Sequence, residues 1–221
     1  MRTISHYDRT CDTTEEWSFL NAHKDLLKNT GKMWHFDPDE VHEIAVIYYK
    51  LLKESESGIK DELPSKNFSN FLHKAFGFAD DSLIERIFVA LDGITTHVSL
   101  KTYLTAMSLY LRGTMQEKVI YCFKVYDLLG KMEIKRDQMV NLLRRFVYKH
   151  QEEDIEESVK DLVDIIIKKI DLDKDGVVSF QDYSTSVRKE PMLLECFGQV
   201  LPDRKHCYAF LTTFTDKIKE F

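Results

Sequence analysis

Asp171-Leu-Asp-Lys-Asp-Gly-Val-Val-Ser-Phe-Gln-Asp182 is the most informative stretch of this chain of 221 residues. It carries oxygen-bearing side chains at positions 1, 3, 5, 9 and 12, and Gly176 stands at position 6. Carboxylates at positions 1, 3 and 5 of such a loop converge on one centre, and a hard cation such as Ca²⁺ takes six to eight oxygen ligands. Gly176 permits the positive φ that the sharp turn needs. The stretch therefore predicts a cation site of the EF-hand type.

The spacing assigns six ligands to this loop. They are the side chains of Asp171, Asp173 and Asp175, the backbone carbonyl of Val177, and the side chains of Ser179, often through water, and Asp182. A solvated acidic turn is the alternative, but it does not explain why Gly176, Val178 and Phe180 all stand at their EF-hand places.

Position 12 departs from the usual pattern, in which a glutamate binds the ion through both oxygens. Asp182 is one methylene shorter and reaches the ion less easily in this way, which favours the six-coordinate geometry of Mg²⁺. The sequence predicts a Ca²⁺ site of weakened affinity at which Mg²⁺ competes.

Two further loops have the frame of an EF-hand without its ligands. Within the loop from Asp127 to Gln138, Leu129 stands at position 3, Lys131 at position 5 and Met132 at position 6. A lysine repels a divalent cation, and a side chain at the turn adds a steric cost. The stretch from Asp92 to Thr102 is one residue short and lacks carboxylates where they are needed. We expect both loops to be free of metal.

Apolar residues recur at three and four positions through most of the chain, which is typical of helices that bury one face. Glycine and proline are scarce, at 8 and 4 residues, which also favours helices. A first helix is expected from Thr13 or Thr14 to about Asn29, with Trp17, Leu20, Lys24 and Leu27 on one stripe. Asp37-Pro38 is a strong start signal for the next.

The loops recur at intervals of about 40 residues, and each has a β-branched residue at the place where paired loops bridge: Val98, Ile134 and Val178. The predicted fold is all-α, with paired EF-hands in two lobes of helix-loop-helix units joined by short loop-to-loop β bridges. The predicted parts are an N-terminal helical extension (1–34), an N-terminal lobe with degenerate loops (35–113), a C-terminal lobe with the intact loop (114–200) and a C-terminal helical tail (201–221).

Composition and short sequence motifs narrow the classes of function that are expected for this chain. The net charge of −6 disfavours a broad grip on nucleic acid, and no apolar run approaches the roughly 20 residues that cross a bilayer. The first residues lack the apolar stretch of a signal peptide and the glycine that N-myristoylation requires, so no membrane anchor is expected. The four cysteines are far apart, which favours free thiols in a reducing, intracellular compartment. No phosphate loop, nucleophile elbow or zinc-protease motif occurs, so the chain is not expected to be an enzyme.

Beyond these motifs, the chain resembles EF-hand proteins of the neuronal calcium sensor type, and among them the calaxin-like proteins. The resemblance covers roughly residues 35 to 205. The stretches that carry it are Phe76-Gly-Phe-Ala-Asp-Asp81, Leu109-Tyr-Leu-Arg-Gly-Thr114 with Glu117-Lys118, Tyr121-Cys-Phe123, Asp161-Leu-Val163, Leu193-Leu-Glu-Cys-Phe-Gly198 and Leu201-Pro-Asp203.

The resemblance implies an axonemal subunit of cilia and flagella that binds the coiled coils of the outer dynein arm docking complex, a dynein heavy chain and the doublet microtubule. It also implies Ca²⁺ regulation of the beat, including sperm motility. Because this chain keeps acidic ligands in one loop, a role as a structural clamp fits it better than a role as a sensor. The alternative is a cytosolic calcium sensor or buffer that acts on another protein target.

Overall fold

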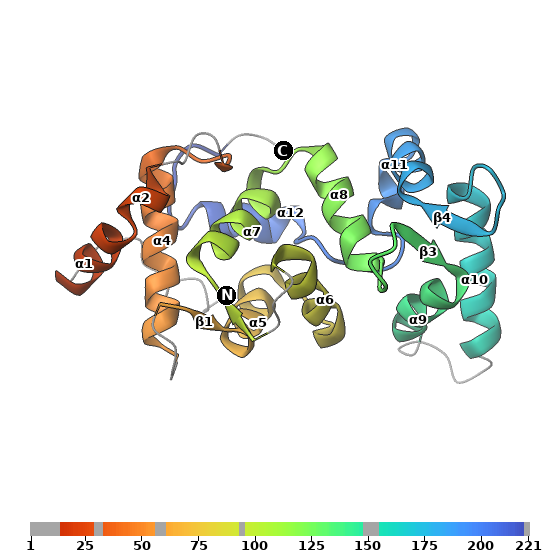
Figure 1. Cartoon of the computed structure of the whole chain (residues 1–221), viewed down its shortest axis with the longest axis horizontal. Helices are drawn as coiled ribbons and strands as arrows, with labels where there is room; N and C mark the ends of the chain where they lie inside the picture. Colours follow the sequence, from red (N-terminus) through yellow and green to blue (C-terminus); the bar gives the residue numbers. More distant parts are fainter. Residues whose placement is uncertain (1–13, 29–32, 56–60, 93–95, 148–154, 219–221) are drawn as a thin grey trace. The chain divides into compact units, whose positions relative to one another are not determined.

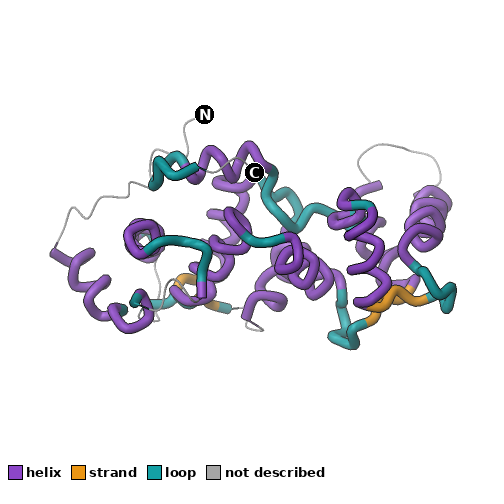
Figure 2. The backbone as a smooth tube through the Cα atoms, turned by 90° about the horizontal axis from the view of Figure 1, so that it is seen from above, coloured by secondary structure: helices purple, strands orange, loops and turns teal. Residues whose placement is uncertain are grey.

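The computed structural model describes residues 14–28, 33–55, 61–92, 96–147 and 155–218. Helices account for most of these residues, and the strands are two or three residues long (Figures 1 and 2). The predicted all-α fold with small β bridges is confirmed. The chain divides into two compact units: unit 1 comprises Met1–Thr114 with Pro202–Phe221, and unit 2 comprises Met115–Leu201.

Unit 1 is built from seven described helices and two strands. The helices are α1 (Thr14–Ala22), α2 (Lys24–Leu27), α4 (Pro38–Lys53), α5 (Ser65–Phe76), α6 (Asp81–Asp92), α7 (Leu100–Arg112) and α12 (Arg204–Leu211), and the strands are β1 (Leu63–Pro64) and β2 (His97–Val98).

The first predicted helix is interrupted: α1 ends at Ala22, and the separate turn α2 begins at Lys24. Thr13, one of its two predicted caps, lies outside the described residues. The predicted stripe is also only partly buried, because Trp17 is 60% exposed while Phe19 and Leu20 are buried. The ring of Phe19 lies 4.8 Å from that of Tyr49 in α4, so this packing turns Trp17 outward.

The predicted start of α4 is confirmed in detail. Asp37 caps the helix: its carboxylate accepts from the amide of Glu40 (3.0 Å), and the carboxylate of Glu40 accepts from the amide of Asp37 (3.1 Å). This reciprocal pair is a capping box, and Pro38 occupies the first turn, where its missing N–H costs nothing.

The two strands of unit 1 reveal a hand that the sequence analysis did not recognise. β1 pairs with β2 in antiparallel fashion, with Leu63 opposite Val98. The buried hydroxyl of Tyr48 supports the pair, because it donates to the carbonyl of Val98 (2.7 Å) and accepts from the amide of Leu63 (3.2 Å). The segment α4–β1–α5 is therefore the partner of α6–β2–α7. The sequence signal is weak because the bridging residue is a leucine and no carboxylate pattern precedes it.

Unit 2 contains the other pair of hands. Its elements are α8 (Met115–Tyr126), β3 (Glu133–Lys135), α9 (Arg136–Val147), α10 (Ile155–Ile170), β4 (Val177–Ser179), α11 (Phe180–Lys189) and the 3₁₀ helix η1 (Pro191–Glu195). β3 and β4 run side by side in Figure 1, with Ile134 opposite Val178 as predicted. Both side chains are fully buried, so the bridge is part of the core of this unit.

The segment after the last hand, residues 194–201, belongs to unit 2 and packs against its helices α8 and α11. Three buried tyrosines donate to its carbonyls: Tyr183 to Leu194 (2.5 Å), Tyr126 to Gly198 (2.5 Å) and Tyr121 to Val200 (3.1 Å). Glu195 accepts from the amides of Val200 and Leu201 at 2.8 Å each. Burial raises the pKa of the Glu195 carboxyl despite these bonds.

Residues 201–221 form the tail of the predicted layout, and the structure joins Pro202–Phe221 to unit 1. Cys122, Cys196 and Cys207 are free thiols. Among the described helices, none has the length and apolar character to traverse a lipid bilayer.

Candidate metal centre

The predicted cation loop lies between α10 and α11, and its first residue anchors it. Asp171 is buried, and its two carboxylate oxygens accept from the amides of Lys174 (2.8 Å) and Gly176 (3.0 Å). Gly176 has a φ of 85°, as the turn requires. These bonds fold the loop around the Asp171 carboxylate.

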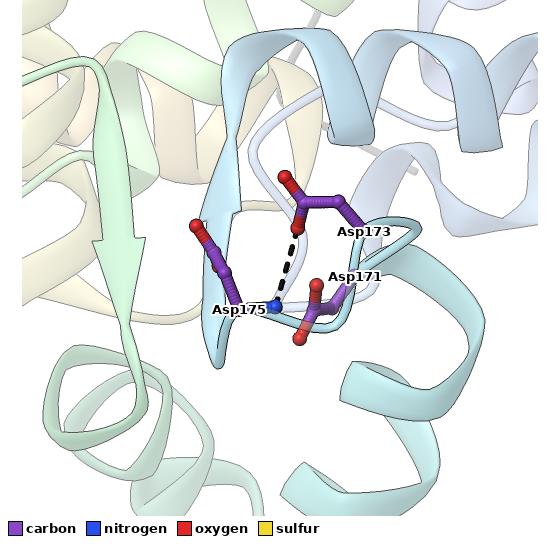
Figure 3. A group of neighbouring side chains, drawn as sticks. All are labelled: Asp171, Asp173 and Asp175. Atoms are coloured by element: carbon purple, nitrogen blue, oxygen red, sulfur yellow. Dashed lines mark hydrogen bonds between the residues drawn. The ribbon is translucent and has the colours of Figure 1, made fainter.

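The next two acidic residues are exposed. Asp173 accepts from the amide of Asp175 (3.2 Å), and Asp175 accepts from the amide of Val177 (2.7 Å). Carboxylate oxygens of Asp171, Asp173 and Asp175 all lie within 4.8 Å of one another, and Figure 3 shows the three side chains around the loop. The structure therefore brings together the predicted ligands at positions 1, 3 and 5.

Charge repulsion in this group is visible in the Asp173 carboxyl. The amide of Asp175 lowers its pKa, but desolvation and the negative charges of Asp175 and Asp182 outweigh that bond, and the pKa is raised. A divalent cation would relieve this repulsion, because it stabilises the charged form of every carboxylate near it. The donor set of three carboxylates suits a hard cation such as Ca²⁺ or Mg²⁺.

The predicted ligands at positions 9 and 12 bind each other. Ser179 caps α11, its hydroxyl donating to the carboxylate of Asp182 (2.5 Å) and accepting from the Asp182 amide (3.1 Å). The Asp182 carboxylate also accepts from the Ser179 amide (3.2 Å) and does not belong to the group of three. Val177, whose carbonyl is the remaining predicted ligand, pairs with Lys135 in the β bridge.

The sister loop, from Asp127 to Gln138, keeps the aspartate at position 1 but lacks carboxylates at positions 3 and 5. Both oxygens of the buried Asp127 accept backbone amides, from Lys131 (3.1 Å) and Met132 (2.7 Å), as those of Asp171 do in its own loop. Met132 takes the left-handed conformation, with a φ of 61°, at the place of Gly176. Gln138 accepts from the amide of Lys135 (2.8 Å). Side-chain oxygens of Asp127 and Gln138 thus hold this loop through its backbone amides, and its expected lack of metal stays a prediction.

In the remaining degenerate loop, residues 93–95 lie outside the described part, so its predicted lack of metal stays a prediction. Within the described ranges, Asp171, Asp173 and Asp175 form the one acidic group with metal-binding geometry.

Helix-loop-helix units paired through β bridges, one with converging carboxylates, define an EF-hand protein. In agreement, residues 116–188 match the family of EF-hand domain pairs. This match spans both hands of unit 2.

More specific similarities extend over most of the chain. Calaxin from Bos taurus is 40% identical over 77% of this chain and 82% of its own length. Calaxin from Homo sapiens is 40% identical over 80% of this chain and 85% of its own length. The chain belongs to the calaxin family.

A more distant relative is guanylyl cyclase-activating protein 1 of Lithobates pipiens, 28% identical over 79% of this chain and 86% of its own length. The resemblance to calaxin-like proteins within the neuronal calcium sensor type is therefore confirmed. The EF-hand pair and these relatives together imply calcium binding.

Proposed function

We propose that this chain is a calaxin-like axonemal subunit that binds the outer dynein arm and its docking complex and supports ciliary and flagellar motility. The observation that carries the proposal is the identity of about 40% with calaxins, which extends over about four fifths of both chains. Its partners would be docking-complex coiled coils, a dynein heavy chain and the doublet microtubule, and its compartment the axoneme in the cytoplasm. The chain would act by binding and not as an enzyme.

In this proposal one loop binds the cation. Asp171, Asp173 and Asp175 supply carboxylates, Val177 supplies its carbonyl, and Ser179 and Asp182 complete the set. For Asp182 to reach the ion, its carboxylate must share or leave the bonds with Ser179, which measure 2.5 and 3.2 Å. This competition lowers Ca²⁺ affinity further than the short side chain alone, and it leaves room for Mg²⁺.

The same geometry argues for a weak conformational response. In calcium sensors the last loop ligand pulls the exiting helix as the ion binds. Here Asp182 already serves α11 as part of its N-terminal cap, and the sister loop places Lys131 where a second ion would sit. A ligand shifts a conformational equilibrium only through its different affinities for the two states. We therefore expect partner binding to change by less than about tenfold with Ca²⁺, which corresponds to about 1.4 kcal/mol.

The second candidate is a cytosolic calcium sensor or buffer that acts on another protein. The relative named guanylyl cyclase-activating protein 1 favours it, because that name describes regulation of a target enzyme. A large Ca²⁺-dependent gain in exposed apolar surface, followed with a hydrophobic dye, would support this candidate. The clamp predicts a small gain.

The deciding experiment is capture of partners from an axonemal extract by the immobilised chain, in Ca²⁺, in Mg²⁺ and in chelator. Recovery of docking-complex and dynein chains with similar yield in all three conditions is the expected result. Recovery only in Ca²⁺, with a hundredfold gain in affinity, would replace the clamp by a sensor. Failure to recover any axonemal component would refute the axonemal role.

A further inference from the structure

One histidine of unit 1 holds the turn that joins two neighbouring helices. The turn, residues 77–80, leads from α5 to α6, and the buried ring of Phe78 lies 6.0 Å from that of Tyr110 in α7. His73 stands in the last turn of α5 and contacts residues on both sides of this turn. Its Nδ1 lies 2.5 Å from the Phe78 carbonyl, and its Nε2 lies 2.7 Å from the carboxylate of Asp81, which begins α6.

Both contacts together need a charged imidazole. A backbone carbonyl and an ionised carboxylate only accept hydrogen bonds, whereas a neutral imidazole carries a single N–H. The neutral ring of His73 can therefore donate to the Phe78 carbonyl or to Asp81, and its other nitrogen then points a lone pair at an oxygen. The imidazolium carries an N–H on each nitrogen and satisfies both contacts at once. The geometry around His73 is thus that of the charged form.

The two helix ends at this turn favour the same form. A cation is stabilised near the C-terminus of a helix and an anion near the N-terminus. His73 lies in the last turn of α5 and Asp81 in the first turn of α6, so each charge stands at the favourable end. Asp80 serves α6 as well, since its carboxylate accepts from the amide of Ser82 (2.9 Å). Lys74, beside His73 in α5, is exposed.

Helix α12 brings one further histidine to this turn. A Cβ atom placed on Gly77 would lie 2.8 Å from Cε1 of His206. Nδ1 of His206 lies 2.8 Å from the carboxylate of Asp203, so this second histidine has its own acidic partner. Arg204 and Lys205, which begin the helix, are exposed. A test of His73 therefore needs His206 as a separate variant.

The two strands that pack on α5 lie away from His73. They meet the helix at its other end, where the amide of Ser65 donates to the carbonyl of Thr96 (3.0 Å). His97, in β2, stands at that end. At a rise of 1.5 Å per residue, about 12 Å of helix separate it from His73.

The bond to His73 also fixes a side chain on the wall of a groove. The groove lies between α5 and α6 and has a volume of about 920 Å³. Asp81 and Glu85 line it from α6, and Ser69 and Asn70 line it from α5. The position of the Asp81 carboxylate on this wall therefore depends on the charge of the imidazole.

We infer that His73, the Phe78 carbonyl and Asp81 form a proton-dependent clasp on the turn between α5 and α6. The clasp is closed when the imidazole is charged and opens when the imidazole loses its proton. Because the unfolded chain has no clasp, this contact adds stability at low pH, and that stability is lost as pH rises through the range in which histidine loses its charge. The inference goes beyond the proposed function, since neither the cation loop nor a partner enters it.

The test is urea unfolding of the full chain in chelator at about pH 6 and about pH 8, on either side of the change of charge. Tryptophan fluorescence is the signal, because Trp17 and Trp34 both belong to unit 1. The ratio of the unfolding equilibrium constant at the higher pH to that at the lower pH should be about tenfold larger in the unchanged chain than in His73→Gln. His42→Gln, at an exposed histidine of α4, is the matched control and should behave like the unchanged chain.

A second variant and a direct measurement complete the test. Asp81→Asn removes the charge that faces the imidazolium, so its ratio should fall toward that of His73→Gln. Nitrogen-15 NMR of the histidine side chains needs no variant for its outcome, and at the lower pH it should find a proton on both ring nitrogens of His73.

Three results would overturn the inference. The first is an equal ratio in the unchanged chain and in His73→Gln. The second is a ratio that falls in His206→Gln and not in His73→Gln, which would assign the pH dependence to α12. The third is a single N–H on His73 at the lower pH, because a neutral ring cannot close the clasp.

Discussion

In the absence of metal, Asp171→Ala and Asp173→Ala should differ in their effect on the free energy of unfolding. Their effect on metal binding should be the same. The Asp171 carboxylate holds two loop amides from a buried position, and a hydrogen bond to a charged group contributes about 1.5–3 kcal/mol. The loop lies at the surface, so in the variant water replaces part of the contribution of these two hydrogen bonds. We therefore expect Asp171→Ala to lower the free energy of unfolding by about 2–3 kcal/mol in chelator. Asp173 is exposed, holds one amide at 3.2 Å and is repelled by its neighbours, so its removal should cost nothing measurable.

The stabilisation of the folded state by Ca²⁺ should then differ between these two variants and the unchanged chain. An ion at a hundred times its dissociation constant stabilises the folded state by about 2.7 kcal/mol. Both variants should lose this increment, because each removes a ligand. Asp127→Ala is the matched control: it removes two amide bonds in the sister loop, so it should destabilise the chain in chelator and keep the full increment in Ca²⁺.

The assay is urea unfolding followed by far-ultraviolet circular dichroism, in chelator and in Ca²⁺, with isothermal titration to count sites. Circular dichroism is required because both tryptophans, Trp17 and Trp34, belong to unit 1 and do not report on the loop. If Asp173→Ala keeps the calcium increment, the ligand assignment is wrong. If Asp171→Ala costs no more than Asp173→Ala in chelator, the role given to the two amide bonds is wrong. Two sites of similar affinity in the unchanged chain would refute the single-site prediction.

Three further predictions follow from single side chains. Asp182→Glu should raise Ca²⁺ affinity and selectivity over Mg²⁺ in titration calorimetry, and an unchanged affinity would mean that position 12 is not a ligand. Tyr48→Phe should lower the free energy of unfolding by about 2 kcal/mol in urea, because the buried amide of Leu63 loses its bond to the hydroxyl; a change below the error of the measurement would contradict this. Burial raises the pKa of Glu40, but its bonds from Arg112, Thr215 and the Asp37 amide outweigh burial and lower it. A lowered pKa contributes stability above its ordinary value of 4.5 that is lost as pH falls through the lowered value, so Glu40→Gln should flatten the acid side of a pH–stability profile.

Features that depend on local spacing could be predicted from the amino-acid sequence. The loop 171–182, the cap at Asp37 and the pairing of Ile134 with Val178 were all predictable, because a ligand set, a capping box and a bridge position each occupy a few consecutive residues. The missing carboxylates at positions 3 and 5 of the sister loop were equally predictable, and its expected lack of metal rests on Leu129 and Lys131 at those positions.

Tertiary structure decided the features that depend on residues far apart in the chain. Leu63 pairs with Val98, which lies beyond α5 and α6 in the chain, so the first hand could not be recognised from its own loop. Phe210 is buried because its ring packs on Phe71 and Phe76 of α5, although the helix that carries it follows unit 2 in sequence. In each case the deciding free energy comes from burial and hydrogen bonding between distant segments, which no local pattern records.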